Sequence, residues 1–205
     1  EVILPHVLCT QIELFGNMPT WTEIEREGRF VVAFGGLALK NTQVNSGGVS
    51  RHTARQAQRA CHAAGVRFVN IGPIRGDVDD ALEARWLPAR PNSDTAIMLA
   101  LAHVLVTEDL YDREFVERGC VGFDVYRDYL TGAADGQPKT PAWAAALSGL
   151  DEADIRNLAH EIARNRTLIT VSWSIQRADH GEQPYWAAIA LAALSGSMGK
   201  PGGGF

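Results

Sequence analysis

Four runs of apolar residues along the chain predict the strands of a β-sheet. The run RFVVAFGG closes on Gly35 and Gly36, as expected of a strand that is buried on both faces and ends in a tight loop. The runs VRFVNIG and TLITVSW repeat this pattern. The run ARWLPAR predicts a weaker strand that ends at Pro88, because proline cannot donate a hydrogen bond to a sheet. We therefore expect strands at residues 30–35, 67–71, 85–87 and 168–173.

Helical patterns separate these strands. The segment SRHTARQAQRACHAAG is rich in Ala and Arg, lacks proline and stops at Gly65, a residue suited to a helix C-terminus. A second helix is expected to begin at Asn92 or Ser93, a third at Asp151, and a last one at about Glu182. The apolar face of the second contains Ile97, Leu101 and Val104, and that of the third contains Ile155, Leu158, Ala159 and Ile162.

The alternation of strands and helices with short connections predicts the fold class. It is typical of an α/β protein with a doubly wound, mainly parallel, Rossmann-like sheet that has helices on both faces and right-handed crossovers. We expect residues 1–28 to form a helical lead-in that continues from an upstream region, and residues 29–205 to form the α/β domain. The ending GKPGGGF suggests an internal cut, so the chain is expected to be a fragment of a larger multidomain protein.

Ligands of doubly wound sheets bind in the loops that follow the carboxyl ends of the strands. This rule selects residues 35–42, 72–77, 89–94 and 172–180. Many of these residues also have a purely structural interpretation. Gly35 and Gly36 would form a simple turn, and Lys40, Asn41 and Thr42 a solvated loop. Asp94 would be an acid favoured by the helix dipole, and a surface ion-pair cluster would consist of Arg177, Asp179, His180 and Glu182.

Composition excludes several classes of function. The chain has 205 residues, of which 46% are hydrophobic and 21% charged, as in an ordinary globular protein. A net charge of -5 without a basic stripe argues against binding nucleic acid, and the longest apolar stretches are too short to span a membrane. Three distant cysteines fit neither a disulfide framework nor a metal site. No HExxH, GxGxxG or P-loop pattern is present, so the residues alone predict a nucleotide-type binding domain.

Several long segments carry a resemblance to a known family. The segments RPNSDTAIMLALAHVL, TEDLYDREFVERGCVGFD, YLTGAADGQPKTPAWAA and SWSIQRADHGEQPYWAAIALAALSGSMGKPGGGF resemble the S- and N-oxide reductase branch of the dimethyl sulfoxide reductase family. The resemblance implies a molybdenum enzyme that holds its metal with two molybdopterin guanine dinucleotides and takes an oxygen atom from a sulfoxide or N-oxide substrate. It also implies that the serine ligand of molybdenum precedes Glu1, so no catalytic or metal-binding residue is assigned in this chain.

The same resemblance assigns cofactor-binding roles to residues in the four loops. Lys40 and Arg75 match residues on the phosphate side of the dinucleotide, and Asp94 matches an acid that accepts hydrogen bonds from guanine. The sequence departs from the family at Gly72, because an Asn commonly precedes the proline there. Trp173, Gln176 and Arg177 match a strand end near the pterin. The full expected set is Gly36, Lys40, Asn41, Thr42, Ile71, Gly72, Pro73, Arg75, Asn92, Asp94, Trp173, Gln176 and Arg177.

The expected partners of this segment are the remaining domains of the same enzyme. Two interpretations from other classes stay open at this point: a stand-alone nucleotide-binding module without catalysis, and a structural remnant that binds no cofactor. A reading frame that continues on both sides of the segment would favour the enzyme over both.

Overall fold

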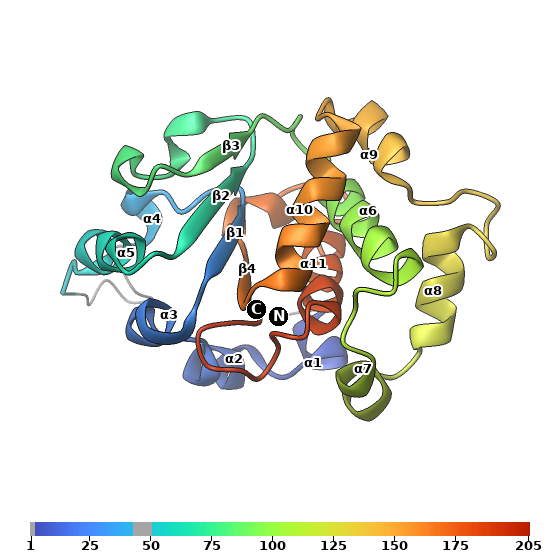
Figure 1. The fold of residues 1–205 in the computed structure, drawn as a ribbon, viewed down its shortest axis with the longest axis horizontal. Helices are drawn as coiled ribbons and strands as arrows, with labels where there is room; N and C mark the ends of the chain where they lie inside the picture. Colours follow the sequence, from blue (N-terminus) through green and yellow to red (C-terminus); the bar gives the residue numbers. More distant parts are fainter. Residues whose placement is uncertain (1–2, 43–50) are drawn as a thin grey trace.

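The computed structural model describes residues 3–42 and 51–205. The strands β1 (Phe30–Phe34), β2 (Arg67–Ile71), β3 (Arg85–Leu87) and β4 (Thr167–Val171) form one sheet in the order β3-β2-β1-β4 (Figure 1). All three strand pairings are parallel, which confirms the predicted α/β fold. Phe34 pairs with both Ile71 and Val171, and Ile71 pairs with Leu87, so the four carboxyl ends lie level along one edge. We call this edge the carboxyl edge.

The strands end for local reasons that the sequence shows in part. Strand β1 ends at Phe34, one residue before the predicted end, because Gly35 turns the chain with a φ of 76°. Strand β3 ends directly before Pro88. The prediction that the fourth strand extends to Trp173 was wrong. Strand β4 ends at Val171 because the hydroxyl of Ser172 accepts a hydrogen bond from the backbone of Ser174 and starts the 3-10 helix η3 (Trp173–Gln176).

The two faces of the sheet bury alternate residues of each strand. Phe30, Val32 and Phe34 belong to the large core under α6 (Asp94–Thr107), α10 (Glu152–Arg164) and α11 (Gln183–Leu194). Val31 and Ala33 belong to a smaller core under α3 (Trp21–Glu27) and α5 (Ala54–Ala63). Burial of each large apolar side chain contributes about 1.5–3 kcal/mol. The central strand is therefore covered on both sides, as its continuous apolar run predicts.

Helix α6 is more deeply buried than its sequence pattern predicts. One apolar face was expected, but Met98, Leu99, Ala100 and Ala102 are buried as well as that face. The helix packs against α8 (Phe123–Thr131), α9 (Pro141–Ser148), α10 and α11, so nearly every side meets another element. Ser93 precedes the helix as expected, but its hydroxyl does not cap the helix and donates instead to the carbonyl oxygen of Arg90, 2.6 Å away.

The connections wind the sheet in two directions from β1. From β1 the chain crosses through α5 to β2 and then, through η1 (Arg75–Asp77) and η2 (Asp80–Leu82), to β3. From β3 it returns across the opposite face through α6 and α10 to β4 on the other side of β1. The direction and the face reverse together, so both crossovers have the same hand. The switch point, where a crevice forms in such sheets, therefore lies between the ends of β1 and β4.

The remaining helices have local signals in the sequence. Thr10 and Thr20 form capping boxes with Glu13 and Glu23 at the starts of α2 (Gln11–Asn17) and α3, while α1 (Leu4–Val7) contacts α11. The hydroxyl of Thr140 caps α9, after which the chain leads to α10. Helix α7 (Arg113–Gly119) and the short α4 (Leu39–Thr42) complete the set. No helix in residues 3–42 or 51–205 has the length and apolar character needed to cross a membrane.

Candidate functional site

The loops after β1 and β4 pack closely at the switch point. Gly35 and Gly36 both have positive φ angles, of 76° and 82°. A Cβ atom added at Gly35 would lie 2.8 Å from the Cβ of Ser172, and one added at Gly36 would lie 2.6 Å from the carbonyl oxygen of Asp77. The backbone of Ser172 also donates to the carbonyl of Phe34 at 2.8 Å. Close approach of the loop after β4 thus accounts for Gly35, and close approach of the loop after β2 accounts for Gly36.

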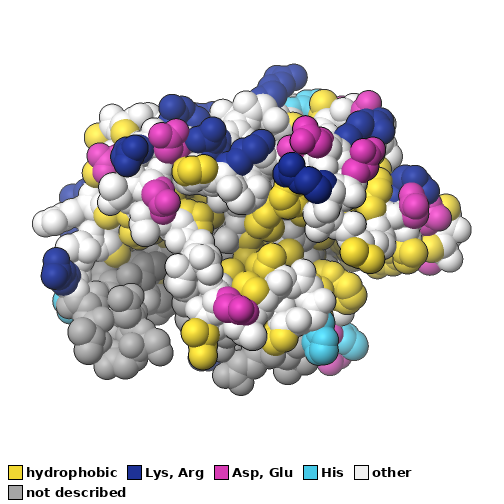
Figure 2. Space-filling model, turned by 90° about the horizontal axis from the view of Figure 1, so that it is seen from below, with side chains coloured by type: hydrophobic (Ala, Val, Ile, Leu, Met, Phe, Trp, Pro, Cys, Tyr) yellow, Lys and Arg dark blue, Asp and Glu magenta, His cyan; other side chains and the backbone are white. Residues whose placement is uncertain are grey.

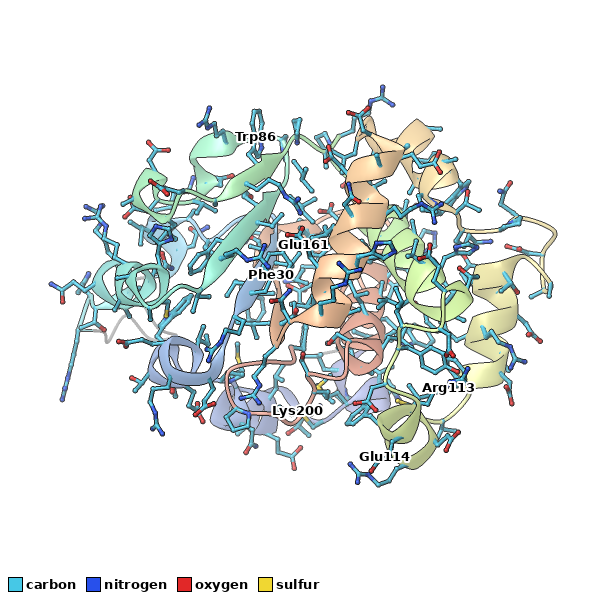
Figure 3. All side chains as sticks on the ribbon, in the orientation of Figure 1. Phe30, Trp86, Arg113, Glu114, Glu161 and Lys200 are labelled. Carbon is cyan, nitrogen blue, oxygen red and sulfur yellow. The ribbon has the colours of Figure 1, made fainter. Side chains whose placement is uncertain are left out.

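The loops after β2 and β3 join the same edge through the backbone. The amide of Gly72 donates to the carbonyl of Leu87 at 3.1 Å, and the indole Nε1 of Trp86 donates back to the carbonyl of Gly72 at 2.9 Å. Figure 3 shows Trp86 at the end of β3, on the side of the sheet away from the chain termini. Gly72 is buried between these groups, whereas Pro73 and Arg75 are exposed just beyond it.

Asn70 orders the loop after β2 and was missed by sequence reasoning. Its side-chain Nδ2 donates to the carbonyl oxygens of Ile74 at 3.1 Å and Arg75 at 3.4 Å. The residue is buried, and within the described residues its Oδ1 has no hydrogen-bond partner. A polar residue inside the apolar run VRFVNIG was the signal that could have revealed it. Asn70 supplies an amide at this turn, two positions before Gly72, where the family's usual Asn is absent.

Three cations at the carboxyl edge extend into solvent. The Nζ of Lys40, on α4, lies 4.0 Å from Oδ1 of Asp77, a distance at which an exposed ion pair contributes little to stability. Arg75 and Arg177 are exposed, and in the described part of the chain neither makes an ion pair. Asn41 is exposed next to Lys40, and Thr42 is the last residue of α4. The rest of that loop, residues 43–50, lies outside the described residues.

Asp94 differs from these cations because it is buried. It is the first residue of α6 and is 8% exposed, and its burial raises the pKa of its carboxyl group. A hydrogen bond from its own backbone amide opposes that shift. Among residues 3–42 and 51–205, no other side chain donates to the carboxylate or pairs with it. Burial of a carboxylate that no other described side chain compensates costs stability. A carboxylate also has more acceptor sites than one amide fills, so the remaining sites are open to a donor on a ligand.

The loop after β4 is polar and largely solvent-accessible. Trp173 is 53% exposed, and Gln176 and Arg177 are exposed beside it. Tyr185 from α11 contacts this loop, because its hydroxyl donates to the carbonyl oxygen of Ser172 at 3.4 Å. Burial raises the pKa of Tyr185 to about 12. The structure therefore offers an indole surface and polar side chains at the switch point.

One hollow lies at the opposite, amino-terminal ends of the strands. It has a volume of about 310 Å³ and is lined in part by Phe30, Arg67, Arg85 and Glu161. Figure 3 labels Phe30 and Glu161. Glu161 pairs with both arginines, at 2.7 Å and 2.5 Å, so its charges are mutually satisfied. We give more weight to the carboxyl edge, because its acid and two arginines lack such partners. No cluster of three or more His, Cys, Asp or Glu side chains suited to a metal occurs in the described residues.

A level parallel edge with a switch point is typical of α/β domains that bind ligands at the strand ends, and this edge carries a buried acid and exposed cations. Comparisons with known proteins refine this class. The sequence profile of the molybdopterin oxidoreductases matches residues 20–205, so the chain belongs to that family.

Curated relatives of the chain are S- and N-oxide reductases. It is 41% identical to the biotin sulfoxide reductase of Cereibacter sphaeroides, over 99% of this chain and 27% of the relative. It is 37% identical to the dimethyl sulfoxide/trimethylamine N-oxide reductase of Cereibacter sphaeroides and to trimethylamine-N-oxide reductase 1 of Escherichia coli strain K12, in each case over 100% of this chain and 25% of the relative. The chain thus spans about a quarter of the length of these relatives.

A solved structure shares the fold. Acetylene hydratase from Pelobacter acetylenicus superposes with a TM-score of 0.70 at 22% sequence identity, over 89% of this chain and 23% of that one. At this identity the likeness supports the architecture alone.

Proposed function

We propose that this chain is the segment of a molybdenum-dependent S-oxide or N-oxide reductase that binds one guanine dinucleotide of a bis(molybdopterin guanine dinucleotide) cofactor. The observation that carries the proposal is Asp94, a buried carboxylate that no other described side chain pairs with, at the carboxyl edge of a molybdopterin oxidoreductase domain. When bound, the cofactor supplies the molybdenum centre that accepts an oxygen atom from the substrate. The residues of this chain bind and orient the dinucleotide.

The chemistry of Asp94 suits guanine. A carboxylate has two acceptor oxygens, and guanine presents a ring N–H and an exocyclic amine side by side. The two hydrogen bonds would be charge-assisted and shielded from water, since Asp94 is 8% exposed. Asn92 lies two residues before Asp94, in the left-handed region with a φ of 66°, and its exposed side chain is available to the same ligand.

The remaining candidates suit the other parts of the dinucleotide. Lys40, Arg75 and Arg177 carry positive charge at the same edge, and guanidinium groups bind phosphate oxygens in pairs. Trp173 and Gln176 offer an aromatic surface and an amide next to the switch point. The backbone of Gly36, Ile71, Gly72 and Pro73 brings the chain close to the ligand, with Asn41 and Thr42 on the first loop.

The rest of the enzyme is the proposed partner of the face on which α1 and α2 lie. Leu8, Ile12 and Met18 are 40%, 85% and 45% exposed there. Figure 2 shows apolar side chains gathered in the hollowed middle of the face seen from below, with charged side chains along its upper rim. Relatives are about four times as long as this chain, which supports further domains of the same polypeptide as the occupant.

A paired substitution tests the guanine site in the intact enzyme. Asp94→Asn removes the charge and replaces an acceptor with a donor, and each lost charge-assisted hydrogen bond costs about 1.5–3 kcal/mol. Guanine nucleotide and molybdenum per chain should fall more than tenfold, while turnover per molybdenum stays unchanged. Asp154→Asn is the control, because Asp154 also lies in a helix first turn but is only partly buried. Equal loading of the two variants would reject the proposal and leave Asp94 as a helix-dipole acid.

A further inference from the structure

The loop that carries Asp94 is fastened to the end of a helix from another part of the chain. This loop, residues 89–94, follows β3, and its Arg90 reaches the last turn of α9. The Nη1 of Arg90 donates to the carbonyl oxygens of Ala146 at 3.1 Å and Leu147 at 3.4 Å. The backbone amide of Arg90 donates to the carbonyl oxygen of Ser148 at 2.9 Å. The last carbonyls of a helix have no partner within the helix and lie at its negative end, so a guanidinium is well placed there.

Gly149 makes room for this contact. It ends α9 with a φ of 77°, and its amide donates to the carbonyl of Ala145. A Cβ atom added at Gly149 would lie 3.3 Å from Nε of Arg90 and 3.5 Å from its Cζ. A side chain here would therefore press on the guanidinium group itself, which makes Gly149 a second position at which the contact can be disturbed without removing a charge.

Arg90 is joined to Asp94 by a compact turn. The carbonyl oxygen of Arg90 accepts hydrogen bonds from both the hydroxyl of Ser93 at 2.6 Å and the amide of Ser93 at 3.3 Å. Asp94 follows Ser93 directly and begins α6. The position of the Asp94 backbone is thus set from two sides, by α6 itself and by the anchor of Arg90 on α9.

We propose that Arg90 is a positioning residue for guanine recognition, which holds the turn carrying Asp94 in its binding conformation without contacting the ligand. The inference rests on the proposed role of Asp94. A lysine would replace Arg90 only in part, because an ammonium lacks the planar fork that meets two carbonyls from one side. A small displacement of a buried carboxylate weakens both of its hydrogen bonds to a flat base at once.

The test uses the intact protein with Arg90→Ala, Arg90→Lys and Gly149→Ala. Guanine nucleotide and molybdenum per chain report loading, and hydrogen exchange of the amides in residues 88–97 reports the order of the turn. We expect Arg90→Ala to lower guanine content about tenfold and to accelerate hydrogen exchange. Gly149→Ala should change both quantities in the same direction. For Arg90→Lys, both quantities should lie between those of Arg90→Ala and the unaltered protein. Turnover per molybdenum should stay unchanged in the molecules that load.

Arg113→Ala serves as the matched control. Arg113 also makes a two-point contact, with Oδ1 of Asp109 at 2.8 Å from Nε and 2.6 Å from Nη2, but it lies on α7, far from Trp86 in Figure 3. It should load normally. Normal loading of both Arg90→Ala and Gly149→Ala, or faster exchange with full loading, would overturn the inference. Absence of guanine from the unaltered protein would instead overturn the proposed function, and with it the ligand that we assign to this turn.

Discussion

The Nζ of Lys139 lies 2.6 Å from Oδ2 of Asp135, four residues earlier, and is almost completely buried there. The lysine side chain is 3% exposed, and the ammonium group stands 4.1 Å from the centre of the Tyr129 ring. It also donates to the carbonyl oxygen of Gln137. This arrangement closes the turn between α8 and α9, so it fixes the start of the helix whose far end holds Arg90.

Replacement of Lys139 should therefore destabilise the fold. Lys139→Met keeps much of the side-chain volume but removes the ion pair, a hydrogen bond and the cation–π contact. We expect a loss of about 2–3 kcal/mol in the free energy of unfolding, measured by urea denaturation. Lys200→Met is the control, since Lys200 is 53% exposed and 3.7 Å from Asp112, and it should cost less than about 0.5 kcal/mol. Similar values for the two variants would contradict this account.

Asp94 should make stability depend on pH in a characteristic direction. Burial holds its pKa above the ordinary value of 3.8, so its folded-state contribution is fully present below that value and is lost as pH rises through the raised pKa. Asp94→Asn should consequently raise the urea midpoint of the cofactor-free protein at pH 7. The gain should vanish below about pH 4. A variant that is less stable than the original at pH 7 would show that hydrogen bonding to the carboxylate outweighs the cost of its burial.

Gly36 should tolerate no side chain. Gly36→Ala places a methyl group 2.6 Å from both Cβ and the carbonyl oxygen of Asp77. It also puts an alanine into a left-handed backbone conformation that disfavours it. Gly122→Ala isolates the second cost, because Gly122 has nearly the same φ, 81° against 82°, and nothing within 4 Å. We expect about 1–2 kcal/mol for Gly122→Ala and at least about 2 kcal/mol more for Gly36→Ala in chemical denaturation. Equal costs would mean that the loops after β1 and β2 can separate freely.

Cys61 should resist alkylation in the folded protein. It is completely buried on α5, its Sγ donates to the carbonyl of Trp21 at 3.4 Å, and burial raises its pKa to about 11. At pH 8 only about one thiol in a thousand would be ionised even with full access to reagent. Mass spectrometry after iodoacetamide treatment should find Cys9, which is partly exposed, modified at least about 100-fold faster. Comparable rates without denaturant would contradict the packing of α5 on the sheet.

The isolated chain should neither retain molybdenum nor reduce a sulfoxide. It spans about a quarter of the length of its relatives, and no cluster of His, Cys, Asp or Glu suited to a metal occurs in its described residues. Metal analysis and a reduced-viologen assay on the purified chain, beside the intact enzyme as control, provide the measurement. Stoichiometric molybdenum with turnover in the isolated chain would reject the proposal that the site is shared with other domains.

The sequence by itself determined the elements that depend on neighbours along the chain. Strand β1 follows from five consecutive apolar residues closed by Gly35, and the end of β3 follows from Pro88. The period of α10 identifies its buried face, with Ile155 and Leu158 among its residues. Alternation of these elements was sufficient to predict a parallel sheet, because only one hand of crossover packs well.

The tertiary structure alone decided the burial and the contacts of the residues at the carboxyl edge. Asp94 was identified from the sequence by resemblance, but its burial and its lack of a side-chain partner depend on elements far away in the chain. Asn70 and Arg90 form hydrogen bonds to carbonyl oxygens, which every residue possesses, so no sequence pattern marks their partners. Gly36 is explained by its contact with Asp77, which lies 41 residues further along the chain. Periodicity records only local geometry, whereas these contacts arise when the sheet places the strand ends side by side.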